Sequence, residues 1–334
     1  MSNQQVEIAT GRPASASPLF AALDIGGTKI AGGLVDTTGT LVTRLQRPTP
    51  TLGSTHEVAD AVHDVLTGLA RHPRWTETIA VGVGSAGPVD IPAGAVSPVN
   101  IPAWRGFPLL EEIAAHPAAH DLPAVLAGDA VAMTAGEHWQ GAARSHRNAL
   151  CIVVSTGVGA GLVLDGTVYS GLTGNAGHLG HITIDFEGEP CPCGSRGCVE
   201  TFASGTSIAR RALADGWQPP GPDTSAAAVA ACAAQGDPIA RAAFDRAARA
   251  LAAGIAATAT LVEIDTVVIG GGVARSGDLF LQPLRHHLAA YATLPFTDGM
   301  TVAPARLGTD AGLVGAAALA MHHTHPAAAL QPQG

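Results

Sequence analysis

A pattern of apolar strand, glycine-rich turn and second apolar strand occurs twice in the sequence, and it constrains the fold more than any other feature. It runs from Phe20 to Asp36 as FAALDIGGTKIAGGLVD and from Ile152 to Asp165 as IVVSTGVGAGLVLD. Short apolar runs bounded by glycine and polar residues are typical of buried strands. Because two halves of the chain begin alike, we expect two related α/β lobes that face each other.

The first glycine turn is suited to binding phosphate. Gly26 and Gly27 carry no side chain, so backbone N–H groups can approach an anion, and Thr28 adds a hydroxyl donor. Lys29, the single lysine of the chain, adds a positive charge, and Asp24 has the ligand chemistry to hold a hydrated Mg²⁺. A tight hairpin also needs glycine, and the turn matches neither the Walker nor the dinucleotide pattern. The turn alone therefore does not decide its function.

Two further glycine clusters extend the phosphate-binding prediction. Thr156, Gly157 and Gly159 lie in the second turn and offer the same bare backbone. Gly271 and Gly272 follow the strand-like run TVVIG, where a base or a ribose could lie against the backbone. We therefore expect phosphates to bind between the lobes, with a glycine turn contributed from each side.

Four potential metal ligands lie within eighteen residues: His181, Cys191, Cys193 and Cys198. Three thiolates and one imidazole satisfy the tetrahedral shell of a structural zinc ion. Gly194 and Gly197 would let the backbone turn sharply enough for the sulfurs to converge. A disulfide framework is the alternative, but the chain has only five cysteines, and Cys151 and Cys232 stand in apolar runs typical of the core. The spacing thus favours zinc.

The composition is that of a compact globular protein without an affinity for nucleic acid. The 334 residues suffice for two domains, and 47% of them are hydrophobic while 13% are charged. With 18 basic residues and a net charge of -9, the chain lacks the clustered positive charge that nucleic acid binding needs. No apolar run is long enough to span a membrane, and no signal segment is evident. We expect no membrane partner and a reducing, cytoplasmic location.

Five motifs together resemble those of the ROK family of sugar kinases, within the actin and hexokinase superfamily of two-lobed ATP-binding folds. They are DIGGTK at 24–29, STGVGAG at 155–161, GNAGHLGH at 174–181, CPCGSRGCVE at 191–200 and VVIGGGVA at 267–274. The resemblance extends from about Phe20 to Met321. It implies an α/β, two-lobed, ribonuclease H-like fold with a structural zinc site at 181–198.

The resemblance also implies the domain division and the ligands. Residues 19–131 and 311–334 would form the N-terminal lobe and residues 132–310 the C-terminal lobe, after a polar tail at 1–18 that we expect to be disordered. The implied ligands are a small-molecule sugar, ATP, Mg²⁺ and structural Zn²⁺, and the implied assembly is a homodimer; polyphosphate is an alternative donor. The residues expected to bind ATP are Asp24, Gly26, Gly27, Thr28, Lys29, Thr156, Gly157, Gly159, Gly271 and Gly272.

The catalytic base implied by the resemblance is Asp129, in the stretch LAGDAVAMTAGEHWQG. In such kinases an aspartate that follows a strand accepts the proton of the sugar hydroxyl, and a loose phosphoryl-transfer transition state needs a positioned base rather than a strong one. Gly128 stands where the family commonly carries Asn, which removes one hydrogen-bonding side chain. The alternative role for Asp129 is to cap the following helix, an interaction worth about 1 kcal/mol.

A second departure from the family pattern concerns the sugar. His178 replaces the glutamate of Glu-x-Gly-His in the glucose-phosphorylating members, and it resembles the His-x-Gly-His of members that phosphorylate N-acetylmannosamine. A neutral imidazole offers one donor and one acceptor, which suits an acetamido group better than a diol. The alternative is a core or supporting histidine. The residues expected to contact the sugar are Ser85, Gly87, Asn100, Asp129, His178 and Glu200, with Trp104 as a pocket wall or a core residue.

The predicted activity is therefore phosphorylation of the 6-hydroxyl of an N-acetylhexosamine, with N-acetylglucosamine favoured and N-acetylmannosamine or glucose as alternatives. A sugar-responsive DNA-binding regulator of the same family is the competing function. Such regulators carry a winged helix-turn-helix before the first phosphate strand, whereas about twenty residues without an amphipathic pattern precede it here. A sugar sensor without turnover is the third alternative.

Overall fold

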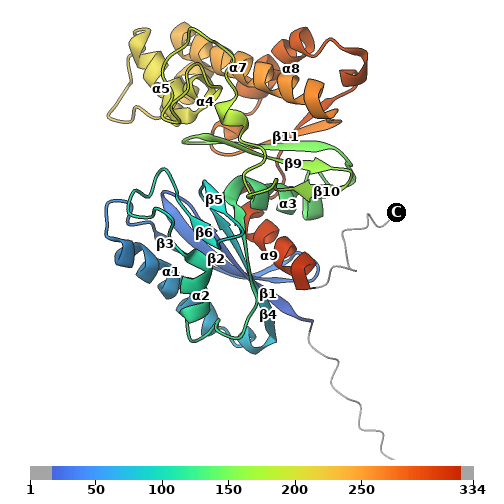
Figure 1. The fold of residues 1–334 in the computed structure, drawn as a ribbon. Coiled ribbons are helices and arrows are strands. Elements are labelled where there is room, and N and C mark those ends of the chain that lie inside the picture. Colours follow the sequence, from blue (N-terminus) through green and yellow to red (C-terminus); the bar gives the residue numbers. More distant parts are fainter. Residues whose placement is uncertain (1–16, 325–334) are drawn as a thin grey trace, which may run out of the picture.

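The computed structural model describes residues 17–324, which build two five-stranded sheets, one in each lobe (Figure 1). The first sheet consists of β1 (Leu19–Ile25), β2 (Lys29–Asp36), β3 (Leu41–Pro48), β4 (Thr78–Ser85) and β7 (Ala124–Gly128). The second consists of β8 (Ala149–Val154), β9 (Val158–Leu164), β10 (Thr167–Tyr169), β11 (Thr266–Gly270) and β12 (Thr301–Pro304). A small pair, β5 (Val89–Asp90) and β6 (Ala95–Val96), lies beside the first sheet.

The two sheets have the same strand order and the same strand directions. In the first sheet the order is β3-β2-β1-β4-β7, with antiparallel pairing among the first three strands and parallel pairing among the last three. The second sheet repeats this as β10-β9-β8-β11-β12. The sequence echo therefore predicted two related α/β lobes correctly, and the fold class is confirmed.

The helices cover the outer faces of both sheets and fill the space between them (Figure 1). Those of the N-terminal lobe are α1 (Thr55–Ala70) and α2 (Leu109–Ala115). Between the sheets lie α3 (Asp129–Gln140) and α9 (Ala311–Thr324). The C-terminal lobe carries α4 (Glu200–Ala203), α5 (Gly205–Ala214), α6 (Ala226–Ala234), α7 (Pro238–Val262) and α8 (Asp278–Tyr291). Short 3-10 turns are η1 (Trp75–Glu77), η2 (Leu179–His181), η3 (Val273–Ser276), η4 (Pro295–Thr297) and η5 (Gly308–Asp310).

Alternate residues of each sheet's first strand face opposite helix layers, as the two-residue period of a strand requires. In β1, Leu23 and its alternate neighbours pack in one core with α1, whereas Phe20 and Ala22 pack against α9. In β8, Ile152 belongs to the core beneath α7, and Cys151 faces α3. Because both faces are covered, both strands are apolar along nearly their whole length.

The long helix α7 covers the outer face of the second sheet, and local signals explain both of its ends. The Asp237 carboxylate accepts the N–H of Ala240 at 2.8 Å, and Pro238 occupies the first turn, where a missing N–H costs nothing. Glu263 ends the helix in the left-handed conformation. Both ends of α7 are thus explained by residues of its own sequence.

The helices α3 and α9 cross where both have glycine. A Cβ on Gly315 would lie 2.7 Å from the backbone N of Gly136, so only glycine lets the two backbones approach this closely. The carboxylate of Glu137, which is fully buried, accepts the N–H groups of Arg306 at 3.1 Å and Leu307 at 2.8 Å. It thereby ties α3 to the segment that leads from β12 into α9. The passage between the lobes is a compact junction rather than a loose linker.

Some predictions fall outside these observations. Most of the tail predicted at 1–18, and residues 325–334 of the predicted N-terminal lobe, lie outside the described residues. The lobe boundaries at 131 and 311 stay predictions. Within residues 17–324, no helix combines the length and the apolar character needed to cross a bilayer.

Candidate active site

Two carboxylates lie together at the edge of the first sheet. Asp24 is near the end of β1, and Asp129 follows the end of β7. The strands β1, β4 and β7 are parallel neighbours, so their carboxyl ends meet at one edge. Gly84 of β4 lies between them, and a Cβ there would be 3.9 Å from the Asp129 Cα. This edge of the sheet therefore concentrates negative charge.

The environment of Asp129 makes its carboxyl group a weaker acid than an ordinary aspartate. The side chain keeps contact with solvent, but the surrounding protein removes much of its hydration, and this loss raises the pKa of Asp129 to about 6. The negative charge of Asp24 raises it further, while the N–H of Ala130, which donates to Asp129 Oδ1 at 2.7 Å, acts in the opposite direction. A carboxyl group that titrates near pH 6 is mostly ionised at neutral pH and can accept a proton.

Asp129 does not cap its helix. The N-cap of α3 is Gly128, which makes no side-chain cap hydrogen bond, and Asp129 is the first helical residue. The alternative structural role for this aspartate is therefore wrong, although its charge at the helix N-terminus is still favourable.

Asp24 lies against the start of α9. A Cβ on Gly312 would be 2.8 Å from the carboxylate carbon of Asp24, so glycine at this position makes room for the acid. Burial raises the pKa of Asp24, and the positive charges of Lys29 and Arg44 lower it in part. Two neighbouring carboxylates with raised pKa values are a suitable donor set for a divalent cation, which would relieve their repulsion.

The first glycine turn is packed against two other loops. Gly27 accommodates the side chain of Asn100, since a Cβ at this glycine would overlap the amide group. The hydroxyl of Thr49 donates to the carbonyl of Gly26 at 2.7 Å, and the N–H of Thr49 donates to the carbonyl of Thr28 at 3.1 Å. The exposed amide of Asn100, predicted to bind sugar, thus lies beside the turn predicted to bind phosphate.

The second glycine turn is held by the segment that follows the cysteine cluster. Glu200 Oε2 accepts the N–H of Val158 at 2.7 Å, next to Gly157. The N–H of Gly205 donates to the carbonyl of Ser155 at 2.7 Å, and the hydroxyl of Thr206 donates to the carbonyl of Thr156 at 2.9 Å. In this structure Glu200, predicted as a sugar contact, supports the predicted phosphate turn.

The third glycine cluster, Gly271 and Gly272, packs against the start of the second glycine turn. Gly271 has φ +91°, and a Cβ on it would lie 2.8 Å from the backbone N of Val154, at the start of the turn. Gly272 lies beside Ser155. Gly159 has a different environment, because a Cβ there would be 3.1 Å from the Cβ of Ala130 in α3. Thr156, Gly157, Gly271 and Gly272 are thus brought together, while Gly159 lies in β9 beneath α3.

The predicted metal ligands converge. The ligand atoms of His181, Cys191, Cys193 and Cys198 all lie within 4.8 Å of one another. The sulfurs of Cys193 and Cys198 are 3.8 Å apart, and Cys191 Sγ lies 3.7 Å from His181 Nδ1. A tetrahedral zinc shell with Zn–S bonds of about 2.3 Å has edges of about 3.8 Å, so the spacing fits. All five cysteines are free, which excludes the disulfide alternative among them.

Glycines shape the cluster as the sequence predicts. Gly194 and Gly197 have φ of +92° and +59°, a region that other residues rarely adopt. His178 lies at the start of η2, and its ring stacks on that of His181 with centroids 6.1 Å apart. His178 Nδ1 is 2.9 Å from the carbonyl oxygen of Asn175. Because a carbonyl only accepts, Nδ1 carries the proton, and Nε2 of the neutral ring is left as an acceptor.

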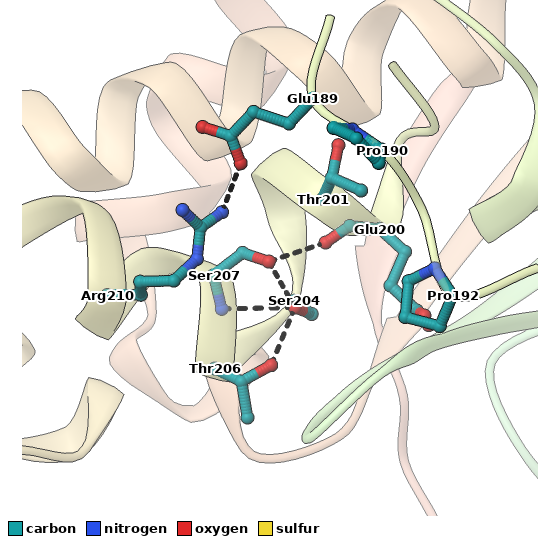
Figure 2. Close-up of a pocket in the computed structure, with 9 residues that line it drawn as sticks. All are labelled: Glu189, Pro190, Pro192, Glu200, Thr201, Ser204, Thr206, Ser207 and Arg210. Carbon is teal, nitrogen blue, oxygen red and sulfur yellow. Dashed lines mark hydrogen bonds and ion pairs between the residues drawn. The ribbon is translucent and has the colours of Figure 1, made fainter. Parts of the chain in front are cut away.

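A pocket of about 280 Å³ opens between the cysteine loop and α5 (Figure 2). It is lined by Glu189, Pro190, Pro192, Glu200, Thr201, Ser204, Thr206, Ser207 and Arg210. Figure 2 shows the side chain of Ser204 at the centre of a hydrogen-bonded group with Thr206 and Ser207, while Arg210 pairs with Glu189 at 2.6 Å. Of the residues predicted to bind sugar or ATP, Glu200 lines this pocket. The pocket therefore lies at one side of the predicted site.

Two predicted sugar contacts have other roles in this structure. Ser85 is fully buried, and its hydroxyl donates to the carbonyl of Ala86 at 3.0 Å. The carbonyl of Gly87 accepts the N–H of Val99 at 3.2 Å, next to Asn100. Trp104 is a core residue rather than a pocket wall, since it is fully buried and donates from Nε1 to the carbonyl of Thr55.

Comparison with known proteins decides the family. A model of the ROK family matches residues 20–323. The chain belongs to the ROK family. It is 36% identical over 312 residues to a glucokinase of Halalkalibacterium halodurans, covering 89% of this chain and 93% of that one. It is also 36% identical over 296 residues to an N-acetylmannosamine kinase of Yersinia pseudotuberculosis, covering 89% and 96%.

A solved ROK structure has the same fold. The glucokinase of Streptomyces griseus, crystallised with glucose and AMPPNP, superposes with a TM-score of 0.79 at 34% identity and covers 91% of this chain and 99% of its own. ROK membership is therefore supported by sequence and by structure.

Sequence reasoning missed one feature of this ROK protein. Asn175 lies inside the quoted motif GNAGHLGH, but nothing in the motif indicated its partner. Its amide binds the backbone of Val89, 86 positions earlier in the chain. Only the fold brings these two loops together.

Proposed function

We propose that this protein transfers the γ-phosphoryl group of ATP to the 6-hydroxyl of an N-acetylhexosamine. One observation carries the proposal: a carboxylate with a pKa of about 6, Asp129, lies beside a second carboxylate at a sheet edge bordered by a glycine turn. The proposed reaction needs these parts, since phosphoryl transfer depends on positioning and charge stabilisation and needs a base only late. The relatives named as sugar kinases support the same activity.

For the nucleotide, we assign the phosphates to the two glycine turns. Gly26 to Lys29 offers bare backbone and one positive charge, and Thr156 to Gly157 offers the same backbone from the other lobe. Asp24 would hold Mg²⁺, which neutralises charge on the phosphates when it is bound. Gly271 and Gly272, next to the second turn, would lie along the ribose or base.

In the proposed reaction, Asp129 orients the 6-hydroxyl and accepts its proton as the new O–P bond forms. Approach of the lobes would exclude water, which competes with the sugar as acceptor. Asn100 and the loop at Gly87 would bind the ring from the N-terminal lobe, with His178 and Glu200 on the opposite side. Ser85 would contribute through the backbone of its loop, because its hydroxyl already has an acceptor.

The choice of an N-acetylated sugar rests on His178. Its Nε2 can accept one hydrogen bond, and the N–H of an acetamido group is a suitable donor. We propose N-acetylglucosamine as the first acceptor and N-acetylmannosamine as the second, since the two differ only in the configuration at carbon 2. The similarity to a protein named as an N-acetylmannosamine kinase is the reason to test the second candidate beside the first.

We propose zinc as the structural ion of the four-ligand cluster. It would be bound by His181, Cys191, Cys193 and Cys198, and it would fix the segment that carries Glu200. A homodimer and the use of polyphosphate as a donor are proposals that rest on the resemblance, and a cytoplasmic location is a proposal that rests on the sequence.

The deciding experiment compares acceptors. Purified zinc-loaded protein is assayed for ADP release with N-acetylglucosamine, N-acetylmannosamine and glucose at equal concentrations, and kcat/KM values are compared. We expect the highest value with an N-acetylated sugar. Dominance of glucose would refute the role given to His178, and no turnover with any of them would favour the sensor.

A further inference from the structure

The side chain of Asn175 binds both backbone groups of one residue in the other lobe. Its Oδ1 accepts the N–H of Val89 at 3.0 Å, and its Nδ2 donates to the carbonyl of the same residue at 2.6 Å. Val89 begins β5, directly after the loop that carries Gly87. A primary amide that satisfies one donor and one acceptor of a single residue mimics a strand neighbour. The contact therefore needs both the donor and the acceptor of the Asn175 amide.

Neighbouring contacts show that two loops, and not only two residues, are joined. The N–H of Ile91 donates to the carbonyl of Thr173 at 3.2 Å. Gly174 has φ +95°, and a Cβ on it would lie 2.6 Å from Ile91 Cδ1 and 2.8 Å from Val89 Cγ2. The apolar side chains of the N-terminal loop thus fill the space that this glycine leaves open. Loop 87–91 and loop 173–178 therefore form one packed unit.

The same residue also orients His178. The backbone carbonyl of Asn175 accepts the Nδ1 proton of His178 at 2.9 Å, which sets the ring tautomer and its direction. One continuous path therefore runs from the backbone of Val89, through the amide of Asn175, to the imidazole of His178. A displacement of Asn175 would move the acceptor atom that the sugar would meet.

We propose that Asn175 is a positioning residue that joins the sugar-facing loops of the two lobes and holds His178 in place. This inference rests on the proposed function. Asn175 acts through His178 and through the loop at Gly87, and it need not touch the sugar. The second phosphate turn has its own supports in Glu200, Gly205 and Thr206, so loss of Asn175 should affect sugar binding selectively.

The test uses Asn175→Ala, Asn175→Asp and a matched control, Asn148→Ala. Asn148 is also half-buried, and its Oδ1 also accepts one backbone N–H, that of Asp165 at 2.9 Å, but this bond lies inside the C-terminal lobe. In Asn175→Asp the acceptor is kept, whereas the donor to Val89 is lost and a carboxylate oxygen faces a carbonyl. Dissociation constants for the three sugars are measured by calorimetry without nucleotide, and KM and kcat are measured with it.

We expect Asn175→Ala to weaken sugar binding about tenfold, the effect of one to two hydrogen bonds, with the KM for ATP changed less than about twofold. Asn175→Asp should bind at least as weakly, and Asn148→Ala should match the wild type. The effects of Asn175→Ala and His178→Ala should be non-additive, because one residue acts through the other. A merely structural role would change the KM for both substrates and would give additive effects.

Amide hydrogen exchange supplies a readout that needs no ligand. In Asn175→Ala, loops 87–91 and 173–178 should both exchange about tenfold faster than in Asn148→Ala. Unchanged exchange in these loops, or sugar binding equal to that of the wild type, would overturn the inference alone. A wild type that binds none of the sugars would overturn the proposed function and, with it, the role given to Asn175 in sugar binding.

Discussion

The pKa of Asp129 predicts the acid limb of the enzyme's pH profile. The proposed base works only when it is ionised, so kcat/KM for the sugar should fall as the pH decreases through the pKa of about 6. With one titrating group, about nine-tenths of the enzyme is active at pH 7 and about one-tenth at pH 5, a difference of about tenfold. An ordinary solvated aspartate would leave the rate unchanged over this range.

The assay measures ADP directly between pH 5 and 8, with sugar and MgATP both well below their KM values. The rate then reports the ionisation of the free enzyme, in which the charge of Asp24 acts on Asp129, and no coupling enzyme contributes its own pH dependence. Terminal phosphates also titrate at about pH 6, so the group that causes the fall of kcat/KM at low pH must be identified. Asp24→Asn removes a negative charge that raises the pKa of Asp129, and the limb of its residual activity should move to lower pH. Titration of the free nucleotide in solution would be insensitive to this substitution.

A limb near pH 4 in the wild type would refute the reasoning, because it would mean that the surroundings of Asp129 do not disfavour its charge. A limb near pH 6 that stays in place in Asp24→Asn would assign the titration to another group.

Four further substitutions test other parts of the site and the fold. Asp129→Asn should lower kcat by about a thousandfold or more, while sugar binding stays measurable by calorimetry. Because the pKa of Asp129 rises from 3.8 in the unfolded chain to about 6 in the folded protein, the stability of the wild type falls as the pH rises through this window. The variant lacks this loss, so it should have a higher Tm than the wild type at pH 7.5 but not at pH 3.5. Cys193→Ser should lose zinc by elemental analysis and raise the KM for the sugar; a metal-free protein with normal kinetics would contradict this coupling. His178→Glu should shift the ratio of kcat/KM values towards glucose, and an unchanged ratio would argue against its role in specificity. Gly315→Ala should lower the free energy of unfolding by about 1–3 kcal/mol in urea, because the added methyl meets the backbone of α3, whereas Gly221→Ala, with open space around it, should be neutral.

The sequence predicted features that depend on local spacing. The repeated strand and turn pattern gave the two related sheets, and the four metal ligands converge because they lie within one short segment with two flexible glycines. The position of Asp129 at a strand end followed from the motif, but its proximity to Asp24 depends on the parallel order of three strands.

Long-range contacts could not be predicted in this way. The bonds from Asn175 to Val89 and from Glu200 to Val158 join positions 86 and 42 residues apart, and polar residues in loops have no periodic pattern that identifies a partner. The sequence also could not show that Trp104 and Ser85 are fully buried, because each lies within three residues of a glycine and a proline, which are typical of loops.

The glycine crossing of α3 and α9 makes the position of Asp129, the proposed base, sensitive to the angle between these two helices. Asp129 lies seven residues from Gly136, so it stands about 10 Å from the crossing point along the helix axis. A rotation of about 10° around that point would move the carboxylate by about 2 Å, several times the tolerance of about 0.5 Å for productive alignment. The proposed base would then be aligned with the sugar hydroxyl at only one angle between α3 and α9, so the fit of Gly315 against Gly136 would set the alignment of the proposed reaction.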